Sequence, residues 1–357
     1  MKIFSIVGTR PNFIKAFPLI YELQKISTHK IIHTGQHYDK ALSNIFFDEL
    51  NIKKPDYIIN LKSKNLTINQ IPEMITKLNI ILRNDLPDAV VVYGDTSSSL
   101  AGALVANKCN IPIIHIESGL RSYDKSMPEE INRIIIDNIS KILICPTETA
   151  KKNLEKENIK KNIFVYGDTN LEAINKISVN LTKYKNLLSK LNLIKKNYIF
   201  LTLHRDFNSD NKQFLIRVFK AIKKIKFKFI CPLHPRTQKN LKQFKLEVPK
   251  NIKIIPPVSF FECIFLQKNS KMVITDSGGL QKEAFFLEIP CVTLRPSTEW
   301  VETLKNKNNI LAHKSSKIIE SAIRDQLKKK FEIKNKNLFG KGEISKKIAK
   351  IIINKII

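Results

Sequence analysis

The chain of 357 residues has no apolar run near the ~20 residues that a membrane-spanning helix needs. Its N-terminal stretch, residues 1–8, lacks the long apolar region and the small-residue cleavage site of a signal peptide. The five cysteines are an odd number without metal-binding spacing and lie in or beside apolar runs, which is typical of reduced, mostly buried thiols. These absences predict a cytoplasmic protein with no membrane partner and no metal site.

Arginine is also scarce, which bears on the net charge of +29. Such a charge suggests a polyanion as partner, yet only nine of the 61 basic residues are Arg. Nucleic-acid readers favour Arg, because its planar guanidinium makes bidentate and stacking contacts. The many Lys are interleaved with Asn and Ile along helical stretches, so we interpret them as solvated surface. The sequence predicts no nucleic-acid partner, with polyanion binding as an alternative that rests on charge alone.

Apolar, strand-like runs alternate with amphipathic stretches along almost the whole chain. Near-continuous apolar strands separated by helices predict an α/β fold with doubly wound parallel sheets. The runs form two sets, separated by a Lys-, Asn- and Leu-rich stretch that predicts one helix over 171–188. We therefore predict two Rossmann-like domains, residues 1–168 and 169–341, that face each other across a cleft. In such folds the ligand binds at the carboxyl ends of the strands.

The most informative strand end is the run DSGGLQKE at residues 276–283. It follows an apolar run and opens a helix, so free backbone N–H groups and the helix dipole favour an anion beside Ser277. Gly278 and Gly279 let the backbone approach a phosphate closely. Glu283 would repel a phosphate but can accept hydrogen bonds from ribose hydroxyls. The run predicts a nucleotide site, with an ordinary loop as the alternative.

Charged residues follow other strand-like runs. These residues are Arg10 and Lys15 after the first run, Asp95 after 89–93, Glu117 after 112–116, Glu129 and Arg133 in the next helix, and His204 after 198–203. Carboxylates beside a nucleotide suit proton transfer at a sugar carbon, and cations stabilise a departing diphosphate. Simpler roles stay open, since Asp95 also suits a helix cap, Glu129 and Arg133 a surface ion pair, and His204 a structural position.

Together these segments resemble the non-hydrolysing UDP-N-acetylglucosamine 2-epimerase family. The matching pieces are GTRPNFIK, TGQHYD, YGDTSSSLAGALVA, HIESGLRS, MPEEINR, PTETAKKNL, LHR, HP and TDSGGLQKEA. The resemblance implies a glycosyltransferase-B arrangement, with a C-terminal helix over about 342–357 that packs back on the N-terminal domain. It also implies a UDP-sugar substrate, a homodimer, and neither metal nor nicotinamide cofactor.

The resemblance further implies an isomerase that interconverts UDP-GlcNAc and UDP-ManNAc. A base removes the C2 proton as UDP leaves to give 2-acetamidoglucal, and UDP then adds back with C2 protonated on the opposite face. The resemblance implies that Asp95, Glu117 and Glu129 act as acid or base. It implies that His204 lies near the diphosphate and that Arg10, Ser277 and Gly278 contact phosphate. Glu283 would contact the ribose, and Lys15 and Arg133 would support the carboxylates or the sugar.

Departures from the family pattern leave the sugar open. Trp300 stands where many UDP-GlcNAc enzymes have Arg, and the run TEWVE resembles the branch that acts on UDP-2,3-diacetamido-2,3-dideoxyglucuronate in surface polysaccharide synthesis. Phe207 replaces a Glu that many members carry after the His-Arg pair. A glycosyltransferase of the same architecture is a remoter alternative. Gln36 and His37 lie where some bacterial members bind an activating UDP-GlcNAc, so activation is also open.

Overall fold

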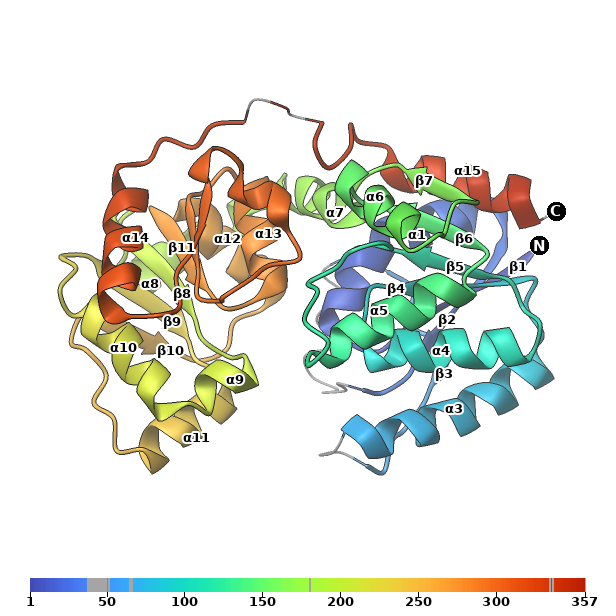
Figure 1. The fold of residues 1–357 in the computed structure, drawn as a ribbon, viewed down its shortest axis with the longest axis horizontal. Coiled ribbons are helices and arrows are strands. Elements are labelled where there is room, and N and C mark those ends of the chain that lie inside the picture. Colours follow the sequence, from blue (N-terminus) through green and yellow to red (C-terminus); the bar gives the residue numbers. More distant parts are fainter. Residues whose placement is uncertain are drawn as a thin grey trace. The chain divides into compact units, whose positions relative to one another are not determined.

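The computed structural model describes residues 1–36, 50, 52–63, 67–179, 181–333, 335 and 337–356. The chain divides into two compact units, which we call unit 1 (Met1–Ala173 and Asn335–Ile357) and unit 2 (Ile174–Lys334). Each unit contains one parallel sheet with helices on both faces (Figure 1), so the predicted α/β class with two doubly wound sheets is confirmed. Within these residues, none of the helices combines the length and hydropathy that crossing a bilayer requires.

Unit 1 is built on a seven-stranded sheet of order β3-β2-β1-β4-β5-β6-β7. Helices α1 and α15 pack together on one face, and α3, α4 and α5 pack side by side on the other (Figure 1). The elements are β1 (Lys2–Val7), α1 (Arg10–Ile26), β2 (Thr28–His33), β3 (Tyr57–Ile58), α3 (Thr67–Asn84), β4 (Ala89–Tyr93), α4 (Ser97–Lys108), β5 (Ile113–Ile116), α5 (Pro128–Ile139), β6 (Ile142–Cys145), α6 (Glu148–Lys156), β7 (Ile163–Val165) and α15 (Ile344–Ile356).

Unit 2 is built on a six-stranded sheet of order β10-β9-β8-β11-β12-β13. After α7 (Thr169–Ser178), which contains the boundary between the units, the elements are η1 (Leu181–Tyr184), α8 (Asn186–Lys190), β8 (Tyr198–Thr202), α9 (Asp206–Ser209), α10 (Lys212–Ile222), β9 (Lys228–Pro232), α11 (Pro235–Gln243), β10 (Ile252–Ile255), α12 (Phe260–Asn269), β11 (Met272–Thr275), α13 (Gly278–Phe286), β12 (Cys291–Thr293), η2 (Val301–Lys307), β13 (Asn309–Leu311) and α14 (Ser316–Lys328).

The single helix predicted over 171–188 is wrong. The chain forms α7, η1 and α8 there instead. Ser178, Val179 and Thr182 have low helix propensity, and they fall where the long helix would have to continue. A second predicted helix, over 39–50, falls almost wholly outside the described residues.

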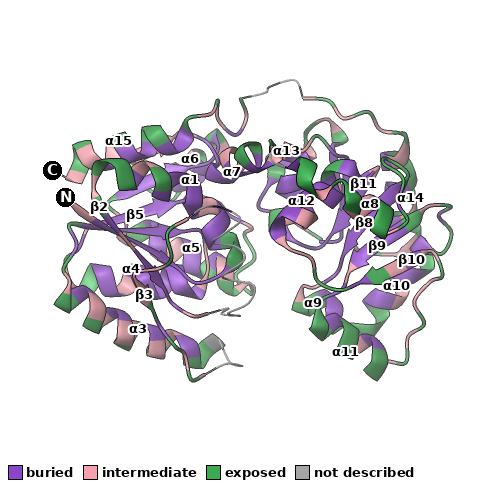
Figure 2. Ribbon diagram, turned by 180° about the vertical axis from the view of Figure 1, so that it is seen from behind, coloured by how far each residue is buried: buried purple, intermediate pink, exposed green. Residues whose placement is uncertain are grey.

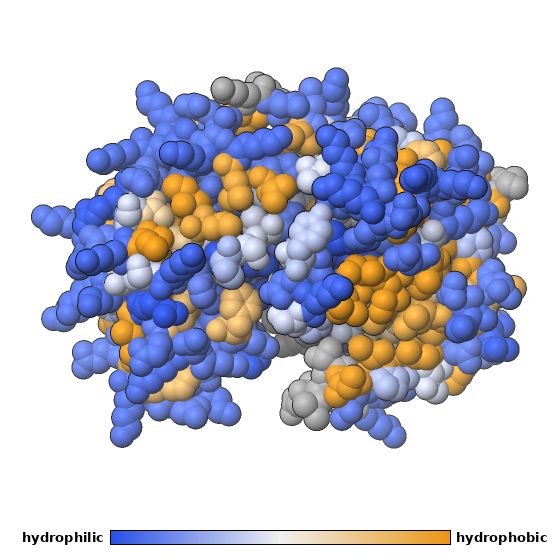
Figure 3. Space-filling view, viewed as in Figure 1, coloured by the Kyte–Doolittle hydropathy of each residue, from blue (hydrophilic) through white to orange (hydrophobic). Residues whose placement is uncertain are grey.

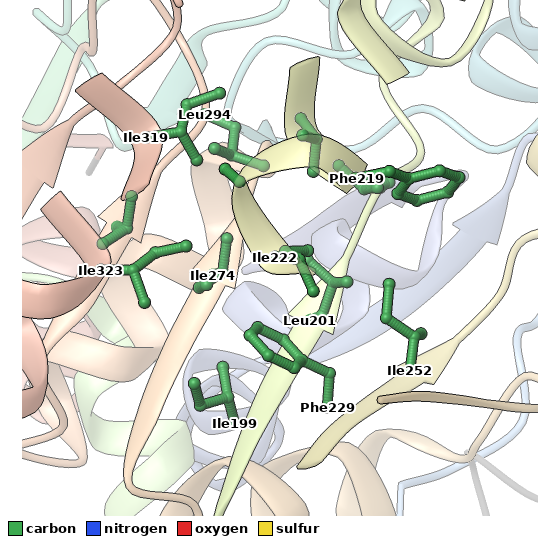
Figure 4. Packing of buried hydrophobic residues seen from close by; sticks show 14 of the residues in the cluster. Ile199, Leu201, Phe219, Ile222, Phe229, Ile252, Ile274, Leu294, Ile319 and Ile323 are labelled. Carbon is green, nitrogen blue, oxygen red and sulfur yellow. The ribbon is translucent and has the colours of Figure 1, made fainter. Parts of the chain in front are cut away.

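The central strands are buried on both faces, as Figure 2 shows in purple. Every residue of β4 is fully buried, which explains why its sequence, AVVVY, is a continuous apolar run without alternation. In unit 2, Leu201 and Ile274 of neighbouring strands pack with Ile222 of α10 and Ile323 of α14 (Figure 4). These cores fix the strands, so the loops at the strand ends start from rigid positions.

Each sheet has a topological switch point, where the strand order reverses direction. It lies between β1 and β4 in unit 1 and between β8 and β11 in unit 2. Loops that leave two such neighbouring strands run to opposite faces and leave room for a ligand at the carboxyl ends. The predicted Arg10 and Asp95 loops lie at the first switch point, and the His204 and Ser277 loops lie at the second.

Candidate active site

The side chain of Asn12 joins the two loops of the unit 1 switch point. Its Nδ2 donates to the Tyr93 carbonyl at 2.7 Å, and its Oδ1 accepts from the backbone N–H of Thr9 at 3.2 Å and from Thr96 Oγ1 at 3.1 Å. Asn12 is fully buried. Sequence reasoning missed this residue, although it lies within the GTRPNFIK motif beside Arg10, which is exposed.

Asp95 is held from helix α5. Arg133 Nη2 donates to Asp95 Oδ2 at 2.5 Å, and Asn132 Nδ2 donates to the Asp95 carbonyl at 2.8 Å. The side chain of Asp95 remains 21% exposed, while that of Arg133 is 4% exposed. The arrangement fixes an ionised carboxylate at the strand end and leaves part of it open to a ligand.

Glu117 is brought close to the Asp95 loop by two local features. Its backbone has a φ of +72°, a left-handed conformation that is rare for a residue with a side chain and is often found at functional sites. Its carboxylate pairs with Lys15 Nζ. The pair lies against Gly94, where a Cβ would be 2.8 Å from Lys15 Nζ and 3.0 Å from Glu117 Oε2. Gly94 has a φ of +62°, a conformation that favours glycine, and a side chain there would displace the Lys15 and Glu117 pair.

The two acids that open α5 have different positions. Glu129 is partly exposed in the first turn, whereas Glu130 is 1% exposed. Glu130 accepts from the backbone N–H groups of Ser122 at 2.8 Å and Tyr123 at 2.9 Å, and Arg133 Nη1 donates to it at 2.9 Å. Glu130 therefore fixes the loop before α5 and the arginine that holds Asp95. Sequence reasoning named Glu129 and missed Glu130, because two adjacent glutamates at the start of a helix cannot be told apart by their sequence positions.

In unit 2, the turn that is predicted to bind a phosphate is held in place by a buried carboxylate. Asp276 is fully buried and accepts from the backbone N–H groups of His204 and Arg205, each at 3.1 Å to Oδ2. His204 Nδ1 lies 3.4 Å from Asp276 Oδ1, and its side chain is 37% exposed. Ser277 caps α13, since its Oγ accepts from Leu280 N at 3.4 Å. The structure thus brings His204 and Ser277 to one switch point through Asp276, which was not among the predicted site residues.

Two further contacts support this turn. Glu283 is 6% exposed. Gln267 Nε2, on α12, donates to Glu283 Oε2 at 2.8 Å and so fixes the orientation of this carboxylate. A buried ion pair, Arg295 Nη1 to Glu299 Oε2 at 3.0 Å, lies directly behind Gly278, where a Cβ would collide with Glu299. Gly278 is therefore required for packing, while Gly279 has only ordinary contacts at a Cβ distance of 3.8 Å or more.

Trp300 lies in the same part of unit 2. It is 3% exposed, and the ammonium of the buried Lys282 lies 3.9 Å from its ring centroid. Of the residues that the structure describes, none form a group of three or more His, Cys, Asp or Glu side chains with the geometry to hold a metal ion.

Comparison with known proteins identifies the family. A sequence model of the UDP-N-acetylglucosamine 2-epimerase family matches residues 21–353. The chain belongs to the UDP-N-acetylglucosamine 2-epimerase family. A UDP-N-acetylglucosamine 2-epimerase homolog of Methanococcus maripaludis is 45% identical over 360 residues, which covers 99% of this chain and 100% of the relative.

Other members of the epimerase family give the same result at full length. The crystal structure of Methanocaldococcus jannaschii UDP-GlcNAc 2-epimerase in complex with UDP-GlcNAc and UDP has a TM-score of 0.92 at 42% identity, over 99% of this chain and 100% of that one. A UDP-2,3-diacetamido-2,3-dideoxy-D-glucuronate 2-epimerase of Pseudomonas aeruginosa is 39% identical over 362 residues, 99% of each chain. The predicted family and enzyme class, an isomerase, are confirmed.

One family motif, TGQHYD, lies half outside the described residues, and His37 is among the residues left out. Gln36 is described, and its Oε1 accepts from Ser98 N at 3.0 Å and from Ser98 Oγ at 2.6 Å. Ser98 is the second residue of α4, so Gln36 ties the epimerase motif to the helix that follows Asp95.

Proposed function

We propose that the chain interconverts UDP-N-acetylglucosamine and UDP-N-acetylmannosamine without hydrolysis. The observation that carries this proposal is that each unit has a group of polar and charged residues at its own switch point. Unit 1 has carboxylates held by Lys15 and Arg133, and unit 2 has the turn at Ser277 above the buried Asp276. The full-length similarity to an enzyme solved with UDP-GlcNAc and UDP supports the choice of substrate.

In the proposed mechanism, unit 2 holds UDP. The backbone N–H groups after Ser277 and the start of α13 suit a diphosphate, and the oriented Glu283 suits ribose hydroxyls. His204 is proposed to lie beside the diphosphate. We propose that Arg10, an exposed cation at the switch point of unit 1, also contacts phosphate. These groups would stabilise UDP as a leaving group, which the reaction requires because the C2 proton of a sugar is hardly acidic.

Unit 1 is proposed to move the proton. Epimerisation through 2-acetamidoglucal needs proton transfer on both faces of C2, and therefore two acid or base groups. Asp95, Glu117 and Glu129 are the candidates. Asp95 and Glu117 each lie beside a cation, which favours the carboxylate over the protonated acid.

The second candidate substrate is UDP-2,3-diacetamido-2,3-dideoxyglucuronate. The observations that favour it are the TEWVE run and the 39% identity to the Pseudomonas aeruginosa enzyme. The C2 chemistry would be the same, and only the substituents at C3 and C6 of the sugar would differ. Both candidate substrates therefore contain UDP and are epimerised at C2, and they differ only in the sugar.

Incubation of each UDP-sugar with the protein in deuterated water tests this function. With UDP-GlcNAc, we expect NMR to detect deuterium at C2 and a product with the manno configuration. Turnover of the diacetamido-glucuronate compound alone would overturn the substrate choice, and turnover of neither would overturn the epimerase proposal. Hydrolysis to free sugar would overturn its non-hydrolysing part.

Variants test the role of Asp95. We expect Asp95→Asn to lose at least ~10²-fold in turnover, as for other general acid or base groups. The matched control is Asp88→Asn, an exposed carboxylate at the opposite end of the same strand, where Asp88 Oδ2 accepts from Lys2 N at 2.6 Å. Near-normal turnover by Asp95→Asn would remove this residue from the catalytic candidates.

We also propose that the enzyme is a homodimer that works in the cytoplasm. Figure 3 shows apolar side chains gathered on unit 1 in the region of α3, α4 and α5. Ile68, Ile80 and Ile131 of these helices are 72%, 55% and 39% exposed. A large exposed apolar surface is typical of a protein contact. Light scattering of the protein and of an Ile131→Glu variant tests this, since a monomeric wild-type protein would contradict it.

A further inference from the structure

A buried network of charged side chains connects the loops at the carboxyl ends of β4 and β5. His115 lies on β5, Asp137 on α5, and Arg121 in the loop after β5, and none is more than 4% exposed. His115 Nδ1 lies 2.7 Å from Asp137 Oδ1, and His115 Nε2 lies 3.0 Å from the carbonyl oxygen of Gly94. The imidazole thus bridges a helix and a turn of the candidate site.

Both ring nitrogens of His115 face an acceptor. A carbonyl oxygen cannot donate, so the nitrogen that faces Gly94 must carry a proton. Asp137 Oδ2 accepts from Gly119 N at 3.2 Å and from Arg121 Nη1 at 2.8 Å, as an ionised carboxylate does. The nitrogen that faces Asp137 must then carry a proton as well. The hydrogen-bond geometry therefore matches a His115 ring that donates to two acceptors, the Gly94 carbonyl and the Asp137 carboxylate.

The charges around the His115 ring come from several elements. Among the described residues they are Asp137 of α5, Arg121, Glu157 after α6, and the Lys15 and Glu117 pair against Gly94. Arg121 donates to Glu157 through Nε at 2.7 Å and Nη2 at 2.6 Å. Burial raises the pKa of Asp137, but the charges and hydrogen bonds of His115 and Arg121 outweigh it, so this pKa lies below its usual range.

The network reaches both turns that carry candidate catalytic carboxylates. Gly94 immediately precedes Asp95, and its N–H donates to the Ile116 carbonyl, directly before Glu117. Gly119, which donates to Asp137, follows Glu117 by two residues. The same helix, α5, also holds Asp95 through the two side chains described above. The separation of the carboxylates therefore depends on His115 and Asp137, although neither is placed to touch a substrate.

We propose that His115, as an imidazolium, and Asp137 are positioning residues that hold the Asp95 and Glu117 turns in one arrangement for epimerisation. This inference rests on the proposed function, in which those carboxylates act at the sugar. An amide side chain in place of His115 cannot replace it, because both of its N–H groups are on one nitrogen. It can serve the Gly94 carbonyl or Asp137, but not both.

Nitrogen NMR of the unaltered protein tests the charge state. In protein labelled with ¹⁵N-histidine, His115 is identified among the seven histidines by the signals that His115→Gln removes. We expect both of its nitrogens to have protonated shifts at pH 8, because each faces an oxygen that accepts a hydrogen bond. One protonated and one unprotonated shift at that pH would overturn the imidazolium.

Kinetics test the positioning. We expect His115→Gln and Asp137→Asn to lower kcat by about 10–100-fold, as for other residues that orient catalytic groups through hydrogen bonds. KM and the calorimetric affinity for UDP should stay unchanged, because the phosphate turn belongs to unit 2. The matched control is His29→Gln, a buried histidine of unit 1 whose ring bonds Ser5 on a neighbouring strand, and it should keep its kcat.

Two kinetic results would overturn the inference. One is a wild-type kcat in Asp137→Asn or in folded His115→Gln, and the other is a loss of UDP affinity as large as the loss in kcat. If His115→Gln does not fold, the kinetics of Asp137→Asn test the positioning role and the nitrogen shifts at pH 8 test the charge state. The His115 signals are then assigned by selective unlabelling of neighbouring residues. A failure of the unaltered protein to turn over either UDP-sugar would instead refute the proposed function, and the charge state of His115 would still be measured.

Discussion

Two buried histidines make the stability of unit 1 depend on pH in the weakly acidic range. His29 on β2 is 6% exposed, and its Nε2 lies 2.9 Å from Ser5 Oγ. His33 ends the same strand, is fully buried, and accepts from Gly35 N at 2.9 Å through Nδ1. Burial lowers the pKa of each imidazole from 6.5 to about 4. Both imidazoles are therefore neutral in the folded protein at neutral pH.

The sign of the effect follows from proton binding. Between pH 6.5 and 4 the unfolded chain binds more protons than the folded chain, so stability is complete above pH 6.5 and is lost as the pH falls toward 4. Because one pKa unit corresponds to about 1.4 kcal/mol, each histidine lowers the free energy of unfolding by about 2 kcal/mol at pH 5 and about 3 kcal/mol at pH 4.

Urea unfolding at pH 7.5 and pH 5 measures this loss. Trp300 is the only tryptophan and lies in unit 2, so its fluorescence follows unit 2, while circular dichroism follows both units. We expect His29→Gln to remove about 2 kcal/mol of the pH-dependent loss in unit 1. Ser5→Ala is the matched control, since it removes the hydrogen bond but keeps the imidazole, and it should be destabilised equally at both pH values. An unchanged pH dependence in His29→Gln would refute the reasoning.

Three further predictions concern the residues around the two switch points. Gly94→Ala forces a side chain into a left-handed turn against the Lys15 and Glu117 pair, so we expect turnover to fall by about 5- to 150-fold, the equivalent of about 1–3 kcal/mol of strain, with calorimetric UDP affinity unchanged. Asp276→Asn replaces a buried acceptor of two backbone N–H groups, and its tryptophan-detected unfolding should lose about 2 kcal/mol; an unaltered midpoint would contradict this. Wild-type protein should bind UDP more tightly than 2′-deoxy-UDP by about 1 kcal/mol, and Glu283→Gln should lose that preference if the carboxylate binds ribose.

The sequence alone could predict where the candidate site lies. Asp95, Glu117 and Ser277 each follow a continuous apolar run, and such runs become strands buried on both faces. Parallel strands end at one edge of a sheet, so residues far apart in the chain come together there. The strength of this inference comes from burial, which fixes the strands before any loop is considered.

Other features depend on tertiary contacts that a linear pattern does not contain. Glu129 and Glu130 open the same helix, and only the rotation of α5 against the preceding loop decides that Glu130 turns inward to Arg133. His115 lies in an apolar strand and meets Asp137 only because β5 and α5 are adjacent in the fold. The break after Ser178 reflects weak helix propensity spread over several residues, which a long amphipathic pattern concealed.

The division of the chain has a consequence for its synthesis. Unit 2 is inserted into unit 1, because residues 335–357 return to the first unit. The last helix, α15, packs against α1 with Ile344, Ile348 and Ile352 fully buried. A chain emerging from the ribosome therefore presents all of unit 2 before α15 is made, so the side of α1 that packs against α15 stays uncovered until then. Loss of α15 would thus leave unit 2 able to fold and unit 1 prone to aggregate.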